Sequence, residues 1–354
     1  MLIQNKALLK PYETRIWQGI PAVECTKSGR TFVAFYSGGM KEELGNFVLL
    51  TMADRFDGDY RLIAVADTPG RRCYDPCLWI DPQGRLWLIW AEMPEHCVMA
   101  AVCEDPEAEE PVFSAPRRVG EDVWLNKPEV LPDGAWVFPG AIWGDGVRTM
   151  GPEYDTQNTP TGAFAAISRD GGKTFRKGAA VRAKDRSFDE NMILRLKDGR
   201  LWMLIRTHYG IAETFSADEG ETWSEPVPSP IPGPDSRFCL RRLPSGRILL
   251  INHIRVEGKR RNNLAALLSE DEGKTFPYSL MLDERGGVSY PDVAFVPDGS
   301  LLVAYDRERG CFKKTVEEAE RDAREILMAH ITEEDILQGR PGEGSRLRLI
   351  VNKL

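Results

Sequence analysis

The string Ser168-Arg-Asp-Gly-Gly-Lys-Thr-Phe175 recurs twice in similar form further along the chain. The later copies are Ser216-Ala-Asp-Glu-Gly-Glu-Thr-Trp223 and Ser269-Glu-Asp-Glu-Gly-Lys-Thr-Phe276. In each copy the serine and aspartate side chains can hydrogen-bond the backbone of a tight turn, a glycine supplies a positive φ, and an aromatic ring can pack beneath the turn. The string therefore predicts a β-hairpin that recurs about every 50 residues.

A second repeat runs through the whole chain: an apolar segment, a turn centred on glycine, and another apolar segment. Each of its six copies is typical of a β-hairpin. The turn glycines are Gly29, Gly84, Gly134, Gly199, Gly246 and Gly299. Their mean spacing of about 54 residues fits four short strands with their loops, the size of one propeller blade. We therefore predict an all-β, six-bladed β-propeller with four antiparallel strands per blade, formed as a single domain by residues 1–354.

Composition excludes several other classes of protein. Hydrophobic residues make up 42% and charged residues 28% of the 354 residues, which disfavours collagen-like and disordered chains. No apolar run is long enough for a membrane span, and the net charge of −8 disfavours nucleic acid or an anionic membrane as a partner. The seven cysteines are an odd number, and the first residues lack the apolar core of a signal peptide, so we expect a cytoplasmic protein with reduced, buried thiols. Residues 313–324 have helical composition, and the apolar residues 326–331 are expected to form a closing strand.

The three strings of the first repeat resemble the Asp-boxes of the sialidase (neuraminidase) superfamily, which implies a β-propeller. Three further stretches resemble the catalytic motifs of that superfamily. They are Glu190-Asn-Met-Ile-Leu-Arg-Leu-Lys-Asp-Gly199 followed by Arg206, Arg261-Asn-Asn-Leu-Ala-Ala-Leu-Leu-Ser269, and Tyr290-Pro-Asp-Val-Ala-Phe-Val-Pro-Asp-Gly299. The resemblance implies that Tyr290 is a nucleophile activated by Glu190, and that Arg206 and Arg261 bind a substrate carboxylate.

Blade topology brings these four residues together independently of the resemblance. The start of an inner strand, the end of the second strand and the start of the third all lie on one face of a four-stranded blade. Glu190 and Tyr290 are expected to begin inner strands, Arg206 to end a second strand and Arg261 to begin a third, whereas the Asp-box turns lie at the opposite face. A carboxylate beside a tyrosine can take its proton, and sialidases with a tyrosine nucleophile depart from the usual two-carboxylate scheme. The alternative is a core tyrosine with a satisfied hydroxyl, and a glutamate that only pairs with Arg206.

The chain also departs from the sialidase pattern in two places. Sialidases begin the first hairpin with an Arg-Ile-Pro triplet, whose arginine completes the triad, whereas this chain has Gly19-Ile20-Pro21. The loop after the first hairpin lacks the acid/base aspartate, and Glu42 lies nearest its position, with Glu43 an equal neighbour; a solvated acidic loop is the alternative. Because a charge-assisted hydrogen bond contributes about 1.5–3 kcal/mol, the gap at Gly19 predicts little hydrolysis of simple sialosides.

Other positions are expected to face the same end of the channel. Asp75, Lys127 and Arg237 lie near the starts of inner strands, and His253 and Asp306 end second strands. We expect all five to contact substrate, with Arg237 or Lys127 as the cation that compensates for Gly19. The longest insertion, about 140–160, carries Trp143, Arg148, Tyr154 and Asp155, and is either a surface loop or the source of an aromatic that stacks on a sugar.

Together these patterns predict an exo-acting glycoside hydrolase, retaining, that removes an anionic or unusual terminal sugar from an oligosaccharide. No motif for a metal, nucleotide or serine-hydrolase site is present, so no cofactor and no metal are expected. A polysaccharide lyase or a rhamnosidase-type hydrolase on the same fold remains an alternative, as does a non-catalytic carbohydrate-binding propeller. The sequence leaves the sugar, the linkage and the oligomeric state open.

Overall fold

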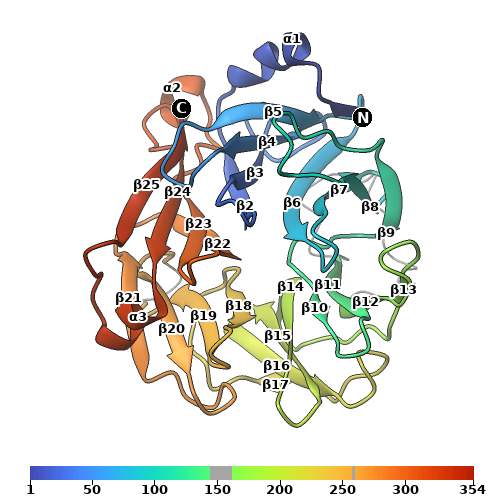
Figure 1. The fold of residues 1–354 in the computed structure, drawn as a ribbon, viewed down its shortest axis with the longest axis vertical. Coiled ribbons are helices and arrows are strands. Elements are labelled where there is room, and N and C mark those ends of the chain that lie inside the picture. The colour runs from blue at the N-terminus through green and yellow to red at the C-terminus, as the bar shows by residue number, and fades with distance from the viewer. Residues whose placement is uncertain (144–161, 257–259) are drawn as a thin grey trace.

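Six blades follow one another around a central channel (Figure 1) in the computed structural model, which describes residues 1–143, 162–256 and 260–354. Over those ranges the strands form six antiparallel sheets, and, apart from β1, strands that follow each other within a sheet are neighbours in it. The predicted six-bladed β-propeller with four antiparallel strands per blade is therefore confirmed.

The first three blades each run from an inner strand to an outer strand. Blade 1 consists of β2 (Gly19–Cys25), β3 (Thr31–Ser37), β4 (Phe47–Ala53) and β5 (Arg61–Ala66), with β1 (Leu2–Ile3) added at its outer edge. Blade 2 consists of β6 (Arg72–Ile80), β7 (Leu86–Met93), β8 (Cys97–Cys103) and β9 (Arg117–Glu121). Blade 3 consists of β10 (Glu129–Val130), β11 (Trp136–Ile142), β12 (Gly162–Ser168) and β13 (Arg176–Lys177).

The last three blades repeat the same order of strands. Blade 4 consists of β14 (Arg186–Arg195), β15 (Leu201–Thr207), β16 (Gly210–Ser216) and β17 (Val227–Pro228). Blade 5 consists of β18 (Cys239–Arg242), β19 (Ile248–His253), β20 (Leu264–Ser269) and β21 (Tyr278–Asp283). Blade 6 consists of β22 (Val288–Phe295), β23 (Leu301–Arg307), β24 (Glu325–Ile331) and β25 (Arg346–Lys353).

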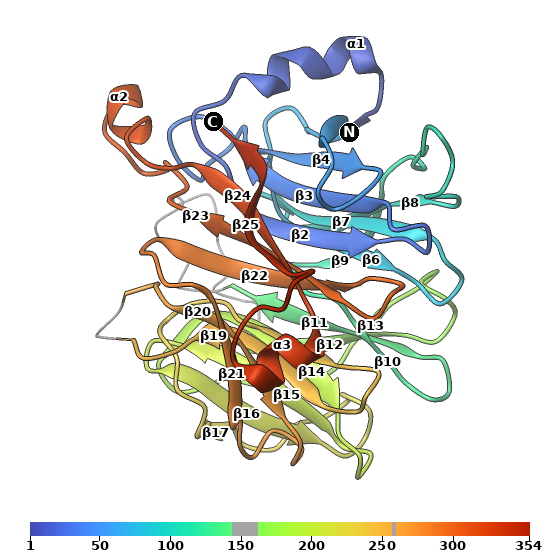
Figure 2. The ribbon, with the colours of Figure 1, turned by 60° about the vertical axis from the view of Figure 1, so that its left-hand side comes forward.

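Helices are short and lie outside the ring (Figure 2). They are α1 (Lys6–Leu9), a 3₁₀ turn (Lys10–Glu13), α2 (Val316–Ala319) and α3 (Glu333–Gln338). The helix expected over residues 313–324 is thus only the four residues of α2, because an isolated helix this short gains little from its own hydrogen bonds. The predicted closing strand is β24, the third strand of its blade, and the more polar β25 is the outer one. None of the helices in the described part of the chain has the length and apolar character of a membrane span.

Both sequence repeats form the predicted turns. The six turn glycines have φ between 86° and 93° and connect the first and second strands of their blades. In the first Asp-box the Asp170 carboxylate accepts hydrogen bonds from the backbone and hydroxyl of Thr174, and Ser168 Oγ accepts from Gly172 N. The boxes that begin at Ser216 and Ser269 repeat these contacts. Each box lies between the third and fourth strands of its blade.

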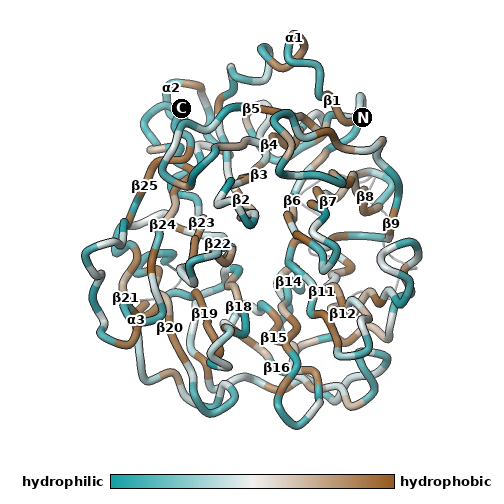
Figure 3. Tube along the Cα trace, viewed as in Figure 1, coloured by the Kyte–Doolittle hydropathy of each residue, from teal (hydrophilic) through white to brown (hydrophobic). Residues whose placement is uncertain are grey.

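The ring is closed by side-chain packing, because blades 1 and 6 share no strand. Hydrophobic segments follow the strands in all six blades, and hydrophilic segments are concentrated in the connections (Figure 3). One apolar cluster joins Val23 and Phe35 of blade 1 to Ala294, Leu302 and Met328 of blade 6. All seven cysteines are free thiols; six are buried and Cys311 is half-buried.

Four inner strands carry the same irregularity near their start. The pairing of β2, β6, β14 and β22 with the second strand shifts register there. In each case a residue within the shift has a left-handed backbone: Ile20 (φ 55°), Asp75 (φ 47°), Asp189 (φ 50°) and Tyr290 (φ 54°). Such bulges redirect side chains and cost about 1–3 kcal/mol of local strain at each left-handed position. They place Tyr290 and its neighbours at one end of the channel.

Candidate functional site

Tyr290, Glu190 and Arg206 form a closed set of hydrogen bonds at this end of the channel. Tyr290 Oη donates to Glu190 Oε1 at 2.9 Å. Arg206 Nη1 donates to Glu190 Oε2 at 2.7 Å and to Tyr290 Oη at 3.0 Å. All three side chains are buried, and they come from β22, β14 and β15. The predicted convergence of these residues is confirmed, and the phenol hydroxyl is in position to pass its proton to Glu190.

Two further arginines that line the cavity lie against the Tyr290 ring. The guanidinium carbon of Arg309 is 4.3 Å from the ring centroid, and that of Arg261 is 5.4 Å away. These residues, together with Arg206 and Glu42, line a cavity of about 720 Å³. Three cations around one hydroxyl can bind an anionic group and can stabilise a phenolate.

Burial is the main influence on the ionisation of Tyr290. It raises the pKa of the phenol, and the adjacent Glu190 carboxylate raises it further, while Arg206, Arg261 and Arg309 oppose both effects. The net shift is upward, so Tyr290 is protonated at neutral pH. The hydroxyl therefore becomes nucleophilic only as Glu190 accepts its proton.

The Asp235 carboxylate fixes the orientation of the Arg206 side chain. Its Oδ1 accepts from Arg206 Nε at 2.6 Å and from Ser187 Oγ at 2.7 Å, and its Oδ2 lies 2.8 Å from His208 Nδ1. Burial acts to raise the pKa of Asp235, but Arg206 and these hydrogen bonds outweigh it and lower the pKa. Since the backbone oxygen of Asp235 also accepts from Arg261 Nη2 at 3.1 Å, one residue positions two of the cavity arginines.

Both candidate acids in the loop after β3 line the cavity, and Glu42 is the more buried of the two. Its side chain is 15% exposed, against 42% for Glu43, which pairs with Lys41. Glu42 Oε2 lies 3.0 Å from Arg72 Nη2, and Oε1 lies 3.3 Å from Arg309 Nη1. Glu42 is therefore paired with Arg309, the same arginine that contacts the Tyr290 ring.

The gap expected beside Gly19 does not exist. A Cβ at this position would lie 2.4 Å from Arg309 Cδ, so the Arg309 side chain occupies the space that a residue-19 side chain would fill. The premise for predicting little hydrolysis of simple sialosides is therefore wrong: a third arginine is present, and it comes from the segment between β23 and β24.

Neither cation proposed to compensate for Gly19 lines the cavity. Lys127 Nζ lies 2.5 Å from Asp292 Oδ2 and also donates to the backbone oxygen of Val23. Its positive charge is therefore paired with the Asp292 carboxylate of blade 6. Arg237 donates from Nε to Asn126 Oδ1 and from Nη2 to the backbone oxygen of Leu125. Both side chains are buried and neither lines the cavity, but the guanidinium carbon of Arg237 is 6.0 Å from the Tyr290 ring centroid, behind the cavity wall.

Three other expected contacts are also buried and do not line the cavity. His253 Nδ1 lies 2.8 Å from the backbone oxygen of Asn262. Asp306 accepts from Ile20 N, Ser289 Oγ and Arg309 Nε, which makes it a positioning residue. Asp75 is 2% exposed, and its Oδ1 has no hydrogen-bond partner among the described residues.

The insertion expected to supply a stacking aromatic lies largely outside the described residues, including Arg148, Tyr154 and Asp155. Trp143, at its start, is 5% exposed and packs against Tyr74 and Phe188, with ring centroids 5.6 and 5.4 Å apart. Trp143 is therefore a core residue and does not present a free face to a sugar.

Sequence reasoning missed Arg309, Arg72 and Asp235. The only sequence signal for Arg309 is its place three residues after Asp306, just beyond the end of β23, the second strand of blade 6. Asp235 lies just ahead of β18, the inner strand of blade 5. Arg72 is the first residue of β6, the inner strand of blade 2. Within the described ranges, no three or more His, Cys, Asp or Glu side chains cluster in a way that would hold a metal ion.

The fold and site define a six-bladed Asp-box propeller with a buried tyrosine–glutamate pair next to three arginines. The BNR repeat-like domain matches residues 30–303. The chain therefore belongs to the BNR repeat-like family of sialidase-superfamily propellers. A sialidase of Micromonospora viridifaciens is 27% identical over 205 residues, which make up 51% of this chain and 31% of that protein. The chain thus matches about a third of the length of this relative.

Solved structures agree on the fold. The Hadza microbial sialidase Hz136 superposes with a TM-score of 0.65 at 18% identity, covering 84% of this chain and 64% of that one. The leech intramolecular trans-sialidase, solved with 2,7-anhydro-Neu5Ac, gives a TM-score of 0.66 at 13% identity, covering 92% of this chain and 69% of that one. At these identities the likeness concerns the fold, so the activity has to be argued from the site.

Proposed function

We propose that the chain is a retaining, exo-acting glycoside hydrolase with Tyr290 as nucleophile and Glu190 as its base. The substrate class is an oligosaccharide that ends in an anionic sugar. The observation that carries this proposal is the hydrogen bond from Tyr290 Oη to Glu190 Oε1, because Tyr290 lines the same cavity as Arg206, Arg261 and Arg309.

In the first step Glu190 takes the phenol proton while Tyr290 Oη attacks the anomeric carbon. The bond from that carbon to the leaving oxygen breaks, and Glu42 gives the leaving oxygen a proton. Arg206 donates to Tyr290 Oη and so stabilises negative charge that develops on the oxygen. A neutral phenol is an appropriate nucleophile near an anionic sugar, because an attacking carboxylate would be repelled.

In the second step Glu42 takes a proton from water, and the water oxygen attacks the anomeric carbon from the face that the leaving group occupied. The bond to Tyr290 Oη breaks, and Glu190 returns its proton to the phenolate. Two inversions at the anomeric carbon give net retention of configuration.

The test compares the unmodified protein with Tyr290→Phe on a panel of aryl glycosides and acidic oligosaccharides that includes an aryl sialoside. We expect turnover of an acidic substrate with retained configuration by NMR, and a loss of at least about a thousandfold in kcat for the variant. Tyr305→Phe is the matched control, since Tyr305 is another buried tyrosine of blade 6 that bonds Asp283 outside the cavity. Wild-type rates in Tyr290→Phe would contradict the covalent mechanism.

The same panel separates the alternatives. A product that absorbs near the ultraviolet edge would indicate a lyase, in which the tyrosine–glutamate pair abstracts a proton. Release of a neutral deoxy sugar would indicate a rhamnosidase-type hydrolase. Binding of an acidic oligosaccharide with no product would indicate a carbohydrate-binding propeller.

A further inference from the structure

We propose that Arg309, from the segment between β23 and β24, is the third cation of the anion-binding site and determines specificity for a carboxylated sugar. This inference rests on the proposed function, because it assigns a binding role within the same cavity. It concerns a residue that neither sequence repeat contains.

The contact between Gly19 and Arg309 is the first support. A Cβ on Gly19 would lie 2.4 Å from Arg309 Cδ, 2.8 Å from Cγ and 2.9 Å from Nε. The φ of Gly19 lies outside the left-handed region, so its backbone does not itself require glycine. Glycine at position 19 is explained by the space that the Arg309 side chain takes up. A side chain at position 19 and the side chain of Arg309 exclude each other.

The hydrogen bonds of Arg309 aim its guanidinium at the reacting end of the cavity. Nε donates to Asp306 Oδ2 at 2.8 Å, and Nη2 donates to Ser289 Oγ at 3.2 Å. Burial acts to lower the pKa of Arg309, but Asp306, Tyr290 and Glu42 outweigh it and raise the pKa. With its charge fixed, the group lies 4.3 Å from the Tyr290 ring centroid.

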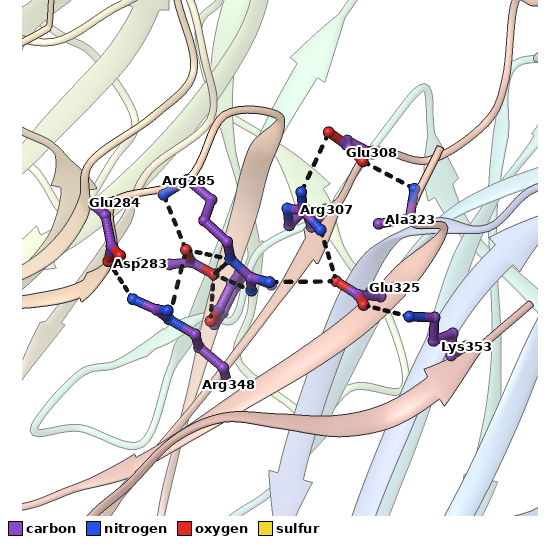
Figure 4. A network of polar contacts seen from close by, with 10 residues as sticks. Asp283, Glu284, Arg285, Arg307, Glu308, Ala323, Glu325, Arg348 and Lys353 are labelled. Atoms are coloured by element: carbon purple, nitrogen blue, oxygen red, sulfur yellow. Dashed lines mark hydrogen bonds and ion pairs between the residues drawn. The ribbon is translucent and has the colours of Figure 1, made fainter. Parts of the chain in front are cut away.

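Ion pairs fix the base of the segment that carries Arg309 (Figure 4). Arg307, the last residue of β23, pairs with Glu325, the first residue of β24, at 3.2 Å. Glu308 Oε2 accepts from Ala323 N at 2.9 Å. These contacts join the two ends of the segment, so Arg309 extends from a fixed base and not from a free loop.

Backbone hydrogen bonds also tie Arg309 to the position of Arg261. Glu308 N donates to Gly287 O at 2.9 Å, and Gly287 N donates to Arg261 O at 2.9 Å. The two arginines therefore keep a fixed separation around Tyr290, which favours a planar anion bound by both. Because they surround the nucleophile, the carboxylate that they bind must lie near the anomeric carbon of the sugar.

The experiment measures binding of N-acetylneuraminic acid and 3-deoxy-manno-octulosonic acid, each against its methyl ester, by calorimetry. We expect the unmodified protein to bind one acid more tightly than its ester. Arg309→Gln should weaken acid binding roughly 10- to 100-fold and leave ester binding nearly unchanged. Arg321→Ala, which removes an exposed arginine of the same segment, should change neither.

Gly19→Ala provides a second, independent variant. The added methyl group carries no charge and no hydrogen bond, yet it must displace Arg309, so it should reproduce the loss of acid preference. The double variant Gly19→Ala/Arg309→Gln should be no weaker than Arg309→Gln alone, because both changes remove one interaction. Moving the cation, in Gly19→Arg/Arg309→Gly, should restore part of the preference. Thermal midpoints identify any variant that is unfolded at the assay temperature.

The outcomes separate this inference from the proposed function. Unchanged acid preference in folded Arg309→Gln and Gly19→Ala, with Tyr290-dependent turnover, would overturn the role of Arg309 alone. Equal binding of acid and ester by the unmodified protein would also overturn it. Absence of both sugar binding and turnover in the unmodified protein would overturn both proposals.

Discussion

Asp75→Asn should remove a pH-dependent loss of stability. Burial raises the pKa of Asp75 from 3.8 to about 7, with Glu190 and Glu42 adding to the shift while Arg72 and Arg237 oppose it. Between pH 3.8 and 7 the unfolded chain releases this proton while the folded chain keeps it, so the folded state loses stability as the pH rises. Three pKa units correspond to about 4 kcal/mol, and Asp75 is buried enough that solvent screening does not reduce this figure much.

Asparagine has the shape of the protonated acid and does not titrate. We therefore expect the unfolding free energy of Asp75→Asn, relative to the unmodified protein, to rise by about 1.4 kcal/mol per pH unit between pH 4 and 7, and to level off above pH 7. Urea unfolding followed by tryptophan fluorescence at four pH values measures this difference. Asp59→Asn, an exposed control, should give a flat line. A difference that stays constant with pH, or that falls as the pH rises, would refute the reasoning.

Lys127→Ala should lower the free energy of unfolding, measured in urea at pH 7, by about 3–5 kcal/mol. It leaves the Asp292 carboxylate buried without the ammonium group that lies 2.5 Å away. Lys127→Met/Asp292→Asn should recover part of this loss, and an equal loss in both variants would argue against a charge effect. Asp218→Ala removes the hydrogen bonds from the Asp-box carboxylate to Thr222 and should lower the thermal midpoint without changing kcat. A lower kcat with an unchanged midpoint would mean that the Asp-box face takes part in catalysis.

Much of the fold could be predicted from the sequence, because its signals are local. A glycine at a hairpin turn is required by the φ of that single position, and each of the six expected glycines has a left-handed backbone. The Asp-box likewise depends on a hydrogen bond between residues four apart, such as Thr174 N to Asp170. Repeated local signals at blade spacing determine the number of blades.

The site was predicted only where strand topology determines it. Tyr290, Glu190 and Arg206 meet because their strand ends share one face. Register gives the face of the propeller but not whether a side chain lines the cavity. Lys127 and Arg237 were therefore expected to contact substrate, although they bond to Asp292 and Asn126 and do not line the cavity. Arg309 was missed because its place in the cavity wall depends on the space left by Gly19, 290 residues away, and no local pattern encodes that contact.

The bulge at the start of the inner strands has a consequence for how the chemistry of the channel can change. Ile20, Asp75 and Tyr290 occupy equivalent bulges with φ values of 55°, 47° and 54°, yet they are an aliphatic, an acidic and a phenolic side chain. The backbone at this position is set by strand pairing on both sides and does not depend on the side chain that it carries. Tyr290, the bulge residue that lines the cavity, is therefore held in its orientation by the backbone before any ligand arrives. A new reactivity can arise by exchanging one residue at a bulge while the blade that presents it stays the same.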